Sequence, residues 1–381
     1  MRERYSISTV ILVKAKDYER QTITKAMEEL FGHLEEQGFS LLDTKTMIKP
    51  NLLCAAPPTS AVCTHFSVIH GLVEQLHKRD IFDLSLGDSP GFGNLQRVAE
   101  AAGISQVCQE TGVKLQRLSP GEEVSVDDGK MVRRVVVARP VVESDQIINV
   151  AKLKTHGLMG FTGAVKNLFG CVPGSDKATL HFRLSHRDHF AEMLVDLYLL
   201  IKPRLSIIDG IVGMEGQGPR QGNPRPLGVL IAGTDAVAVD AVACAVVGID
   251  PMSIPTIRLA DSRGVGQGRL ENIRIIGANL DDVQVNDFRK ADTQATLRGI
   301  PQPVMTLLRK QLTSRPYIIE EKCVGCGICV HCCPADTILL EETARIVDSQ
   351  CIRCYCCHEL CPQDAVGLVP GFLQRVIGLF R

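Results

Sequence analysis

Tryptophan is absent from the 381-residue sequence, and aromatic residues make up only 4% of it. No apolar run reaches the roughly 20 residues that a membrane-spanning helix needs, so we expect no transmembrane span. The formal net charge is −1, which argues against nucleic acid as a partner. The first apolar run, 7–13, is too short for a secretory signal and is followed by Lys14 and Lys16. We therefore predict a cytoplasmic protein.

Cysteine, by contrast, is abundant, with fifteen residues in all. In a chain without a secretory signal this number favours metal ligation over disulfides. Ten of the fifteen lie between Cys323 and Cys361, in two segments that begin at Cys323 and Cys351. Each segment contains the pattern C-x2-C-x2-C-x3-C-P, and the two copies are offset by 28 residues.

This spacing is typical of two-cluster ferredoxins, in which three thiolates of one copy share a cluster with the fourth cysteine of the other copy. We predict two 4Fe-4S clusters. A zinc ribbon is the alternative, but it uses four ligands rather than eight. The first cluster is assigned to Cys323, Cys326, Cys329 and Cys361. The second cluster is assigned to Cys351, Cys354, Cys357 and Cys333.

Two further cysteines, Cys332 and Cys356, do not follow the repeat, because Leu360 and Ile328 occupy the equivalent positions. We interpret them as packing residues or as residues that support the ligands. The segment 317–370 carries eight acidic and three basic residues, and basic residues flank it. Such an acidic carrier could dock on its own chain or on a partner, or the charge could simply be solvated.

The first 290 or so residues alternate strand-like and helix-like patterns, which predicts an α/β domain with a mainly parallel sheet. The cysteine-rich part is expected to be a small α+β ferredoxin-like domain. Strands are expected at Thr9–Val13, Thr46–Ile48, Leu84–Leu86, Arg134–Ala138, Gln146–Val150, Leu205–Ile208, Val229–Ile231 and Ile273–Ile276. Helices are expected at Thr22–Gln37, His65–His77, Asn94–Ala102 and Asp188–Ile201. The expected segments are an α/β domain, 1–292, a basic linker, 293–316, the ferredoxin domain, 317–370, and an amphipathic tail, 371–381.

Polar residues follow several of the expected strands, where open α/β folds bind their ligands. A single Lys or Asp at the end of a strand is most often a turn or cap residue. Here polar segments follow four expected strands, so we expect them to meet at one edge of the sheet. The predicted ligand-binding residues are Lys49, Asn51, Asp88, Ser89, Lys152, Lys166 and Asn167. The predicted catalytic residues are Lys154, His156 and Asp209.

The densest of these segments, Ala151–Gly174, combines three lysines, one histidine and five glycines. We expect its first part to be a loop that leads into a helix near 163–169, which would make an anion site. A glycine-rich structural loop is the alternative. The segment Met214–Gly222 is expected to be a mobile loop. Metal binding through Cys54, Cys63, Cys171 or His181 is a weaker idea, since isolated cysteines are usually buried apolar residues.

These motifs resemble the prokaryotic domain-of-unknown-function family 362. The resemblance rests on Lys49-Pro50-Asn51, Gly87–Gly91, Ala151–Gly174, Asp209-Gly210, the segment 215–219, and Asp235 with Asp240. It covers roughly residues 8–278, and members often carry a ferredoxin module at the C-terminus, as this chain does. The resemblance implies an iron–sulfur protein and names no substrate.

Two functions remain open from the sequence. In the first, the clusters exchange electrons with a reaction or ligand site in the α/β domain, as in a ferredoxin-coupled oxidoreductase. In the second, the chain is a non-catalytic electron-transfer or maturation partner. The partner is either a redox protein or a small-molecule substrate. The tail could contact a membrane surface, but we favour packing on its own chain.

Overall fold

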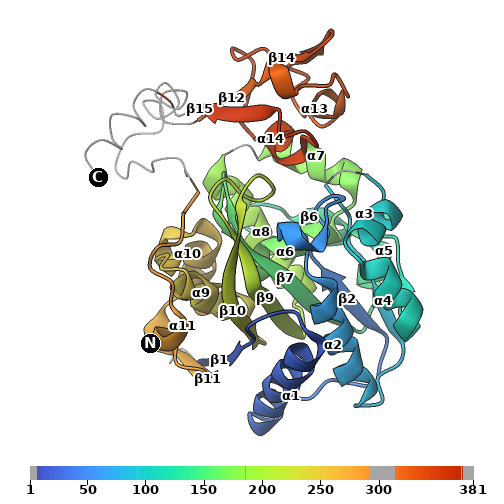
Figure 1. Ribbon diagram of the computed structural model, residues 1–381, viewed down its shortest axis with the longest axis vertical. Coiled ribbons are helices and arrows are strands. Elements are labelled where there is room, and N and C mark those ends of the chain that lie inside the picture. The colour runs from blue at the N-terminus through green and yellow to red at the C-terminus, as the bar shows by residue number, and fades with distance from the viewer. Residues whose placement is uncertain (1–6, 92, 185, 292–313, 370, 372–381) are drawn as a thin grey trace.

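The computed structural model describes residues 7–91, 93–184, 186–291, 314–369 and 371 (Figure 1). Its centre is a nine-stranded sheet in the order β11-β1-β10-β9-β7-β2-β3-β4, with β8 paired to β7. The strands are β1 Ser8–Lys14, β2 Thr46–Pro50, β3 Leu84–Leu86, β4 Lys114–Leu115, β7 Gln146–His156, β8 Gly160–Thr162, β9 Leu205–Glu215, β10 Asn223–Gly233 and β11 Ile273–Gly277.

The sheet is mainly parallel, as the alternating pattern predicts. Strands β7, β2, β3 and β4 pair in parallel, as do β7 with β9 and β1 with β11. Strand β10 is antiparallel to both of its neighbours, so the sheet is mixed. One expected strand lies outside the sheet: β6 (Arg134–Ala138) pairs only with β5 (Gly121–Ser125) in a separate antiparallel hairpin.

Helices cover both faces of the sheet and bury its apolar residues in two cores. One face is covered by α1 Arg20–Glu36, α2 Phe66–His77, α3 Leu95–Ala101 and α4 Ile104–Thr111. The other face is covered by α8 Arg187–Ile201, α9 Ala236–Val246 and α10 Pro255–Ser262. Short helices complete this part of the chain: α5 Arg139–Val142, α6 Ala164–Asn167, α7 Gly174–Arg183 and α11 Leu280–Val283. The apolar stripes of these helices point inward, which explains their amphipathic sequences.

The structure corrects the expected loop at the start of the Ala151–Gly174 segment. Strand β7 continues to His156, and every one of its residues is buried. Lys152, Lys154 and His156 are therefore strand residues inside the protein. The helix expected near 163–169 is a single turn, α6, followed by a 3-10 turn, Leu168–Cys171. The segment Met214–Gly222 joins the antiparallel strands β9 and β10 and includes the last two residues of β9.

The C-terminal cysteine-rich part has small antiparallel sheets of its own and lies over one edge of the main body (Figure 1). Its elements are β12 Arg315–Ile318, α13 Ile328–His331, β13 Ile338–Leu340, β14 Ala344–Ile346, α14 Cys356–Leu360 and β15 Val366–Val369. We call residues 314–369 the module. The expected linker, 293–316, and tail, 371–381, lie outside the described residues apart from 314–316 and 371.

Candidate functional site

The polar residues predicted at strand ends meet at the carboxyl edge of the sheet. Strands β9, β7, β2 and β3 run in parallel, so their carboxyl ends lie side by side. Lys49, Asp88, His156 and Asp209 are all buried there, with at most 4% of each residue exposed. They do not point to separate surfaces, but each of them has its own partner.

Lys152 and Asp209 form a closed charged cluster on the neighbouring strands β7 and β9. Lys152 Nζ donates to Asp209 Oδ2 at 2.8 Å and to the hydroxyl of Tyr18 at 2.7 Å. The Tyr18 hydroxyl in turn donates to Asp209 Oδ1 at 2.8 Å. Burial, together with the adjacent carboxylate, raises the pKa of Tyr18 far above its usual value. Burial lowers the pKa of Lys152, and Asp209 opposes that shift. The cluster satisfies its own charges.

Lys49 and Asp88 form a second closed pair at the ends of β2 and β3. Lys49 Nζ lies 2.9 Å from Asp88 Oδ1, and neither side chain is more than 4% exposed. The other oxygen of Asp88 accepts the backbone N–H of Leu52 at 2.7 Å. Gly170 lies against the pair, and a Cβ atom there would lie 2.5 Å from Lys49 Nζ. A glycine at this position is therefore a packing requirement.

Lys154 belongs to a buried amide network between these two pairs. Its Nζ donates to Asn51 Oδ1 at 2.7 Å and to the carbonyl of Val62 at 2.8 Å. Asn51 Nδ2 donates to Asn167 Oδ1 at 3.2 Å, and Asn167 Nδ2 donates to Asn149 Oδ1 at 2.8 Å. Burial lowers the pKa of Lys154 to about 8. The network links α6 to the end of β2.

His156 connects the sheet edge to the module. Its Nδ1 accepts the backbone N–H of Leu158 at 3.1 Å, and its Nε2 lies 3.2 Å from Glu359 Oε1 on α14. Burial raises the pKa of Glu359 to about 7, although Lys166 and Lys154 lie close enough to oppose the shift. Arg220 and Gln221 add contacts, donating to the carbonyls of Pro362 and His358.

A cavity of about 340 Å³ that opens to solvent lies between the sheet edge and the module. Five predicted ligand-binding residues line it, namely Asn51, Asp88, Ser89, Lys166 and Asn167. Cys332, Cys356, Glu359 and Leu360 line it from the module. Lys49, Lys152, Lys154, His156 and Asp209 do not contribute to its wall.

Lys177 also lines this cavity, and the sequence reasoning missed it. It lies in the first turns of α7, donates a hydrogen bond to the carbonyl of Ser89 and places its ammonium group 5.8 Å from the centre of the Phe169 ring. Burial lowers its pKa to about 8. A sequence signal for Lys177 exists, because Pro173-Gly174 is typical of a helix start and Lys177 lies in the first turn after it.

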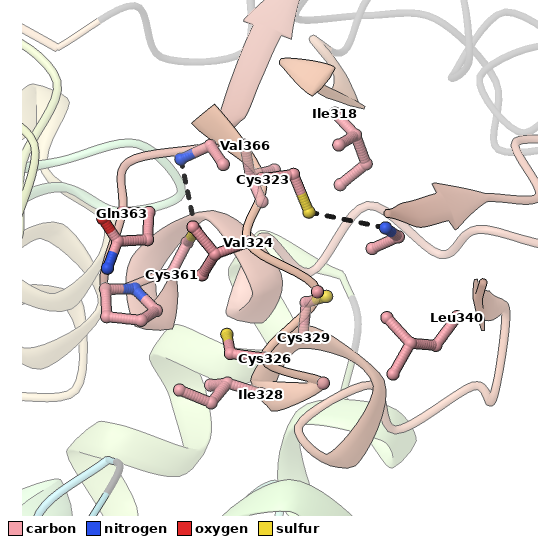
Figure 2. A pocket seen from close by; sticks show the side chains of 15 residues that line it. Ile318, Cys323, Val324, Cys326, Ile328, Cys329, Leu340, Cys361, Gln363 and Val366 are labelled. Atoms are coloured by element: carbon pink, nitrogen blue, oxygen red, sulfur yellow. Dashed lines mark hydrogen bonds between the residues drawn. The ribbon is translucent and has the colours of Figure 1, made fainter. Parts of the chain in front are cut away.

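The first predicted cluster site forms a cavity inside the module (Figure 2). Cys323, Cys326, Cys329 and Cys361 all line it, together with apolar residues such as Ile318 and Leu340. The backbone N–H of Ala344 donates to Cys323 Sγ at 3.4 Å, and that of Ala365 donates to Cys361 Sγ at 3.2 Å. Four thiols around one apolar cavity, with N–H donors aimed at sulfur, fit a 4Fe-4S cluster.

At the second predicted site, thiols and backbone N–H donors also lie close together. Burial raises the pKa of Cys351, as do the nearby thiols of Cys354 and Cys333. The N–H of Thr337 donates to Cys333 Sγ at 3.4 Å, which matches the Ala365 to Cys361 contact 28 residues later. The donor set therefore fits a second cluster as well. Cys332 and Cys356, adjacent in sequence to this ligand set, face the large cavity.

The described residues of the α/β domain do not support the weaker idea of a metal site there. Cys63 Sγ contacts the carbonyl of Cys54 at 3.5 Å, and the side chain of His181 lies outside the described residues. Among the residues that the structure describes, no three His, Cys, Asp or Glu side chains converge as a single metal ion requires. A cubane cluster differs from a single ion, because a separate thiolate holds each of its irons.

Comparison with known families decides the relationship that the motifs suggest. The profile of the family described as a domain of unknown function, DUF362, matches residues 46–245. The chain belongs to this family. A second profile, described as a 4Fe-4S dicluster domain, matches residues 315–362. The DUF362 match spans the strand ends that carry Lys49, Asp88, Lys154 and Asp209. The dicluster match supports iron–sulfur clusters and an electron-transfer role for the module.

The chain also resembles individual proteins. It is 33% identical over 261 residues to a thylakoid-associated protein of Synechocystis sp.. The aligned residues cover 68% of this chain and 80% of that protein. Its fold has a partial similarity to the lactate racemase apoprotein from Thermoanaerobacterium thermosaccharolyticum. That match covers 61% of this chain and 55% of that chain, at 12% identity and a TM-score of 0.36. None of the helices within the described ranges has the length and apolar character to cross a bilayer.

Proposed function

We propose that this protein is a redox enzyme in which two 4Fe-4S clusters exchange electrons with a ligand bound between the module and the sheet edge. The cavity supports this proposal most directly. Asn51, Lys166 and Asn167 line it from the α/β body, while Cys332 and Cys356 line it from the module. A ligand in this cavity would contact both parts of the chain at once. A module that only docked there would not require such a space.

The exposure of the two sites supports a direction for the electrons. Cys326 of the first site is exposed, and its neighbour Val324 is 65% exposed, so a redox partner can approach there. Cys354 and Cys357 of the second site are buried. When bound, the clusters would supply one-electron transfer. We therefore propose that electrons are exchanged with the partner at the first site and with the ligand at the second.

The predicted catalytic residues take different parts in this proposal. His156 positions the module through Glu359, and Lys154 positions the cavity wall through Asn51. Asp209 is enclosed by Lys152 and Tyr18, so we assign it to the stability of the edge. Lys166 and Lys177 are the cations that a ligand in the cavity would reach.

The number of clusters is tested by metal analysis. Anaerobically reconstituted protein should contain about eight iron and eight sulfide per chain, since two four-iron clusters require this number. Cys333→Ser should lower both values to about four and leave the first site intact. A wild-type value near four would contradict two clusters.

Electron exchange with the cavity is tested by reoxidation. Protein reduced with dithionite is mixed anaerobically with the low-molecular-mass fraction of an extract of the source cells, and the visible absorbance of the clusters is followed. Gly174 lines the cavity and has room for a side chain, because an added Cβ would meet only Ser89 Oγ, at 3.9 Å. Gly174→Phe should abolish reoxidation by the extract while keeping its iron and its reoxidation by ferricyanide.

Gly32→Phe on α1 is the matched control, because nothing lies within 4 Å of a Cβ added there. It should behave as the wild type does. If the extract reoxidises Gly174→Phe as fast as the wild type, the cavity is not the site. If the extract never reoxidises the wild type, the alternative of a non-catalytic electron-transfer or maturation partner is favoured.

A further inference from the structure

The charged groups in the cavity wall are not balanced as the buried pairs are. Asp88 is neutralised by Lys49 at 2.9 Å, and Glu359 faces His156 at 3.2 Å. Lys166 and Lys177 line the same cavity, and within the described residues neither has a carboxylate within ion-pair distance. The nearest carboxylates that act on them are Glu359 for Lys166 and Asp88 for Lys177, and these already face His156 and Lys49. Desolvated cations with such incomplete charge compensation are costly, so the cavity favours an anion.

The start of α7 adds to the same preference. Gly174, the first residue of this ten-residue helix, lines the cavity. Pro173 precedes it, and no described side chain caps the helix. The first N–H groups of a helix carry partial positive charge and bind carboxylate or phosphate oxygens. Lys177, from the same helix, donates to the carbonyl of Ser89, which keeps its ammonium group at this wall.

The wall also has an apolar part that includes an aromatic ring, next to the polar side chains of Asn51, Ser89, Asn167 and His331. Leu52, Leu53, Phe169 and Leu360 line the cavity. Phe169 is held in an edge-to-face contact with Phe190, with ring centroids 5.2 Å apart. A fixed ring and three leucines next to two cations suit a molecule with an apolar part and a charged end.

We propose that the cavity binds a small organic oxyanion, with its charged oxygens between Lys166, Lys177 and the start of α7, and its apolar part against Phe169. This inference adds the ligand class to the proposed function and uses the same cavity. A carboxylate and a phosphate ester share the required chemistry, and the probes below distinguish them.

Protonation of the two lysines agrees with this assignment. Burial lowers the pKa of Lys166, and it lowers that of Lys177 to about 8. The groups that act on Lys177 are Asp88, Lys49, Cys171 and Lys166. A bound oxyanion would stabilise the ammonium form of both lysines, so binding should weaken as the pH rises above about 8.

The test is anaerobic calorimetric titration of the iron-loaded full-length protein with benzoate, phenyl phosphate, inorganic phosphate and benzyl alcohol. Benzoate or phenyl phosphate should bind, and the neutral alcohol should bind at least about tenfold more weakly. The tighter of the two aromatic anions identifies the oxyanion. Inorganic phosphate should bind more weakly than phenyl phosphate, because it has no apolar part.

Lys166→Gln and Lys177→Gln should each lower the affinity for the aromatic anion at least about tenfold. Lys177→Arg keeps the charge and should retain most of the affinity, which separates loss of charge from loss of folding. Lys25→Gln is the matched control, since Lys25 is exposed on α1. Equal affinities in the wild type and both Gln variants, equal binding of benzyl alcohol, or no binding of either aromatic anion would overturn the inference.

This outcome is independent of the reoxidation experiment. If the lysine variants lose anion binding but the extract does not reoxidise the clusters, the ligand class stands and the redox function falls. If Gly174→Phe blocks reoxidation while the lysine variants bind as the wild type does, the redox function stands and the oxyanion is wrong.

Discussion

Two sets of lysines lie at the same edge of the sheet, and they differ in whether a carboxylate accompanies them. Lys152 and Lys49 are buried with Asp209 and Asp88 at 2.8 and 2.9 Å. Lys166 and Lys177 are half-buried and line a cavity, and no carboxylate among the described residues lies within ion-pair distance of either. A closed buried pair is self-sufficient, whereas a lysine in a cavity wall without a partner has a position free for a ligand.

Residue type and strand-end position are therefore poor guides to function at this edge. Lys152 and Lys154 are separated by one residue on β7, yet Lys152 is held by a carboxylate and Lys154 by an amide and a carbonyl. The neighbouring strand decides the difference, because Asp209 is the register partner of Lys152 on β9.

The Lys152→Met variant should show the largest effect. It leaves Asp209 buried without its cation, and breaking such a pair costs about 3 to 5 kcal/mol of unfolding free energy. Urea unfolding of the iron-loaded protein measures the loss. Lys14→Met is the control, because Lys14 and Asp282 form an exposed pair at 3.4 Å, and its loss should stay below about 1 kcal/mol. Equal losses would mean that the buried cluster is not a stabilising unit.

The Gly170→Ala variant should disturb the other closed pair. The new methyl group would collide with Asp88 Oδ1 and lie 2.5 Å from Lys49 Nζ, and overpacking of this kind costs about 1 to 3 kcal/mol. Gly32→Ala is the control, since an added Cβ meets nothing within 4 Å on α1 and should be neutral or slightly stabilising. Thermal unfolding distinguishes the two variants, and an unchanged midpoint for Gly170→Ala would show that the pair can move freely.

The pH dependence of stability should reveal Lys154. Burial lowers its pKa to about 8, whereas a lysine in the unfolded chain titrates near 10.4. The folded protein therefore binds fewer protons between these values, and stability rises with pH there. From about pH 7.5 to 9.5 the wild type should gain about 1 to 2 kcal/mol relative to Lys154→Met. Urea unfolding across this range measures the difference, and two parallel curves would contradict the shift.

The Glu359→Gln variant should have the smallest effect on stability, below about 1 kcal/mol, because burial already disfavours the charged form of Glu359 and glutamine keeps a hydrogen-bonding group opposite His156. Its expected signature is local: faster hydrogen exchange in α14 with unchanged iron content. Glu341→Gln, an exposed residue of the module, should leave α14 exchange unchanged. Unchanged exchange in Glu359→Gln as well would mean that other contacts, such as those of Arg220, hold the module.

The positions of most strands and of the main helices follow from the sequence, because their apolar periodicity is strong. The expected strands at 46–48 and 84–86 occur as β2 and β3, and the expected helix Asp188–Ile201 occurs as α8. The extension of β7 was missed, since lysine, histidine and nearby glycines suggest a loop when no neighbouring strand is known. The separate β5–β6 hairpin was missed because an apolar strand does not show which sheet it joins.

The sequence alone determines the repeated cysteine pattern, the membership in the DUF362 family and the α/β class, because each depends on spacing along the chain. It also places the polar residues at strand ends. Only the tertiary structure decides which of those residues are neutralised and which face a cavity. Charge pairing at the edge depends on strand register and on where the module packs against the sheet edge. This packing brings together residues that are far apart in the sequence, such as His156 and Glu359. Lys177 shows the same limit, because its role follows from a helix start that faces the module across the cavity.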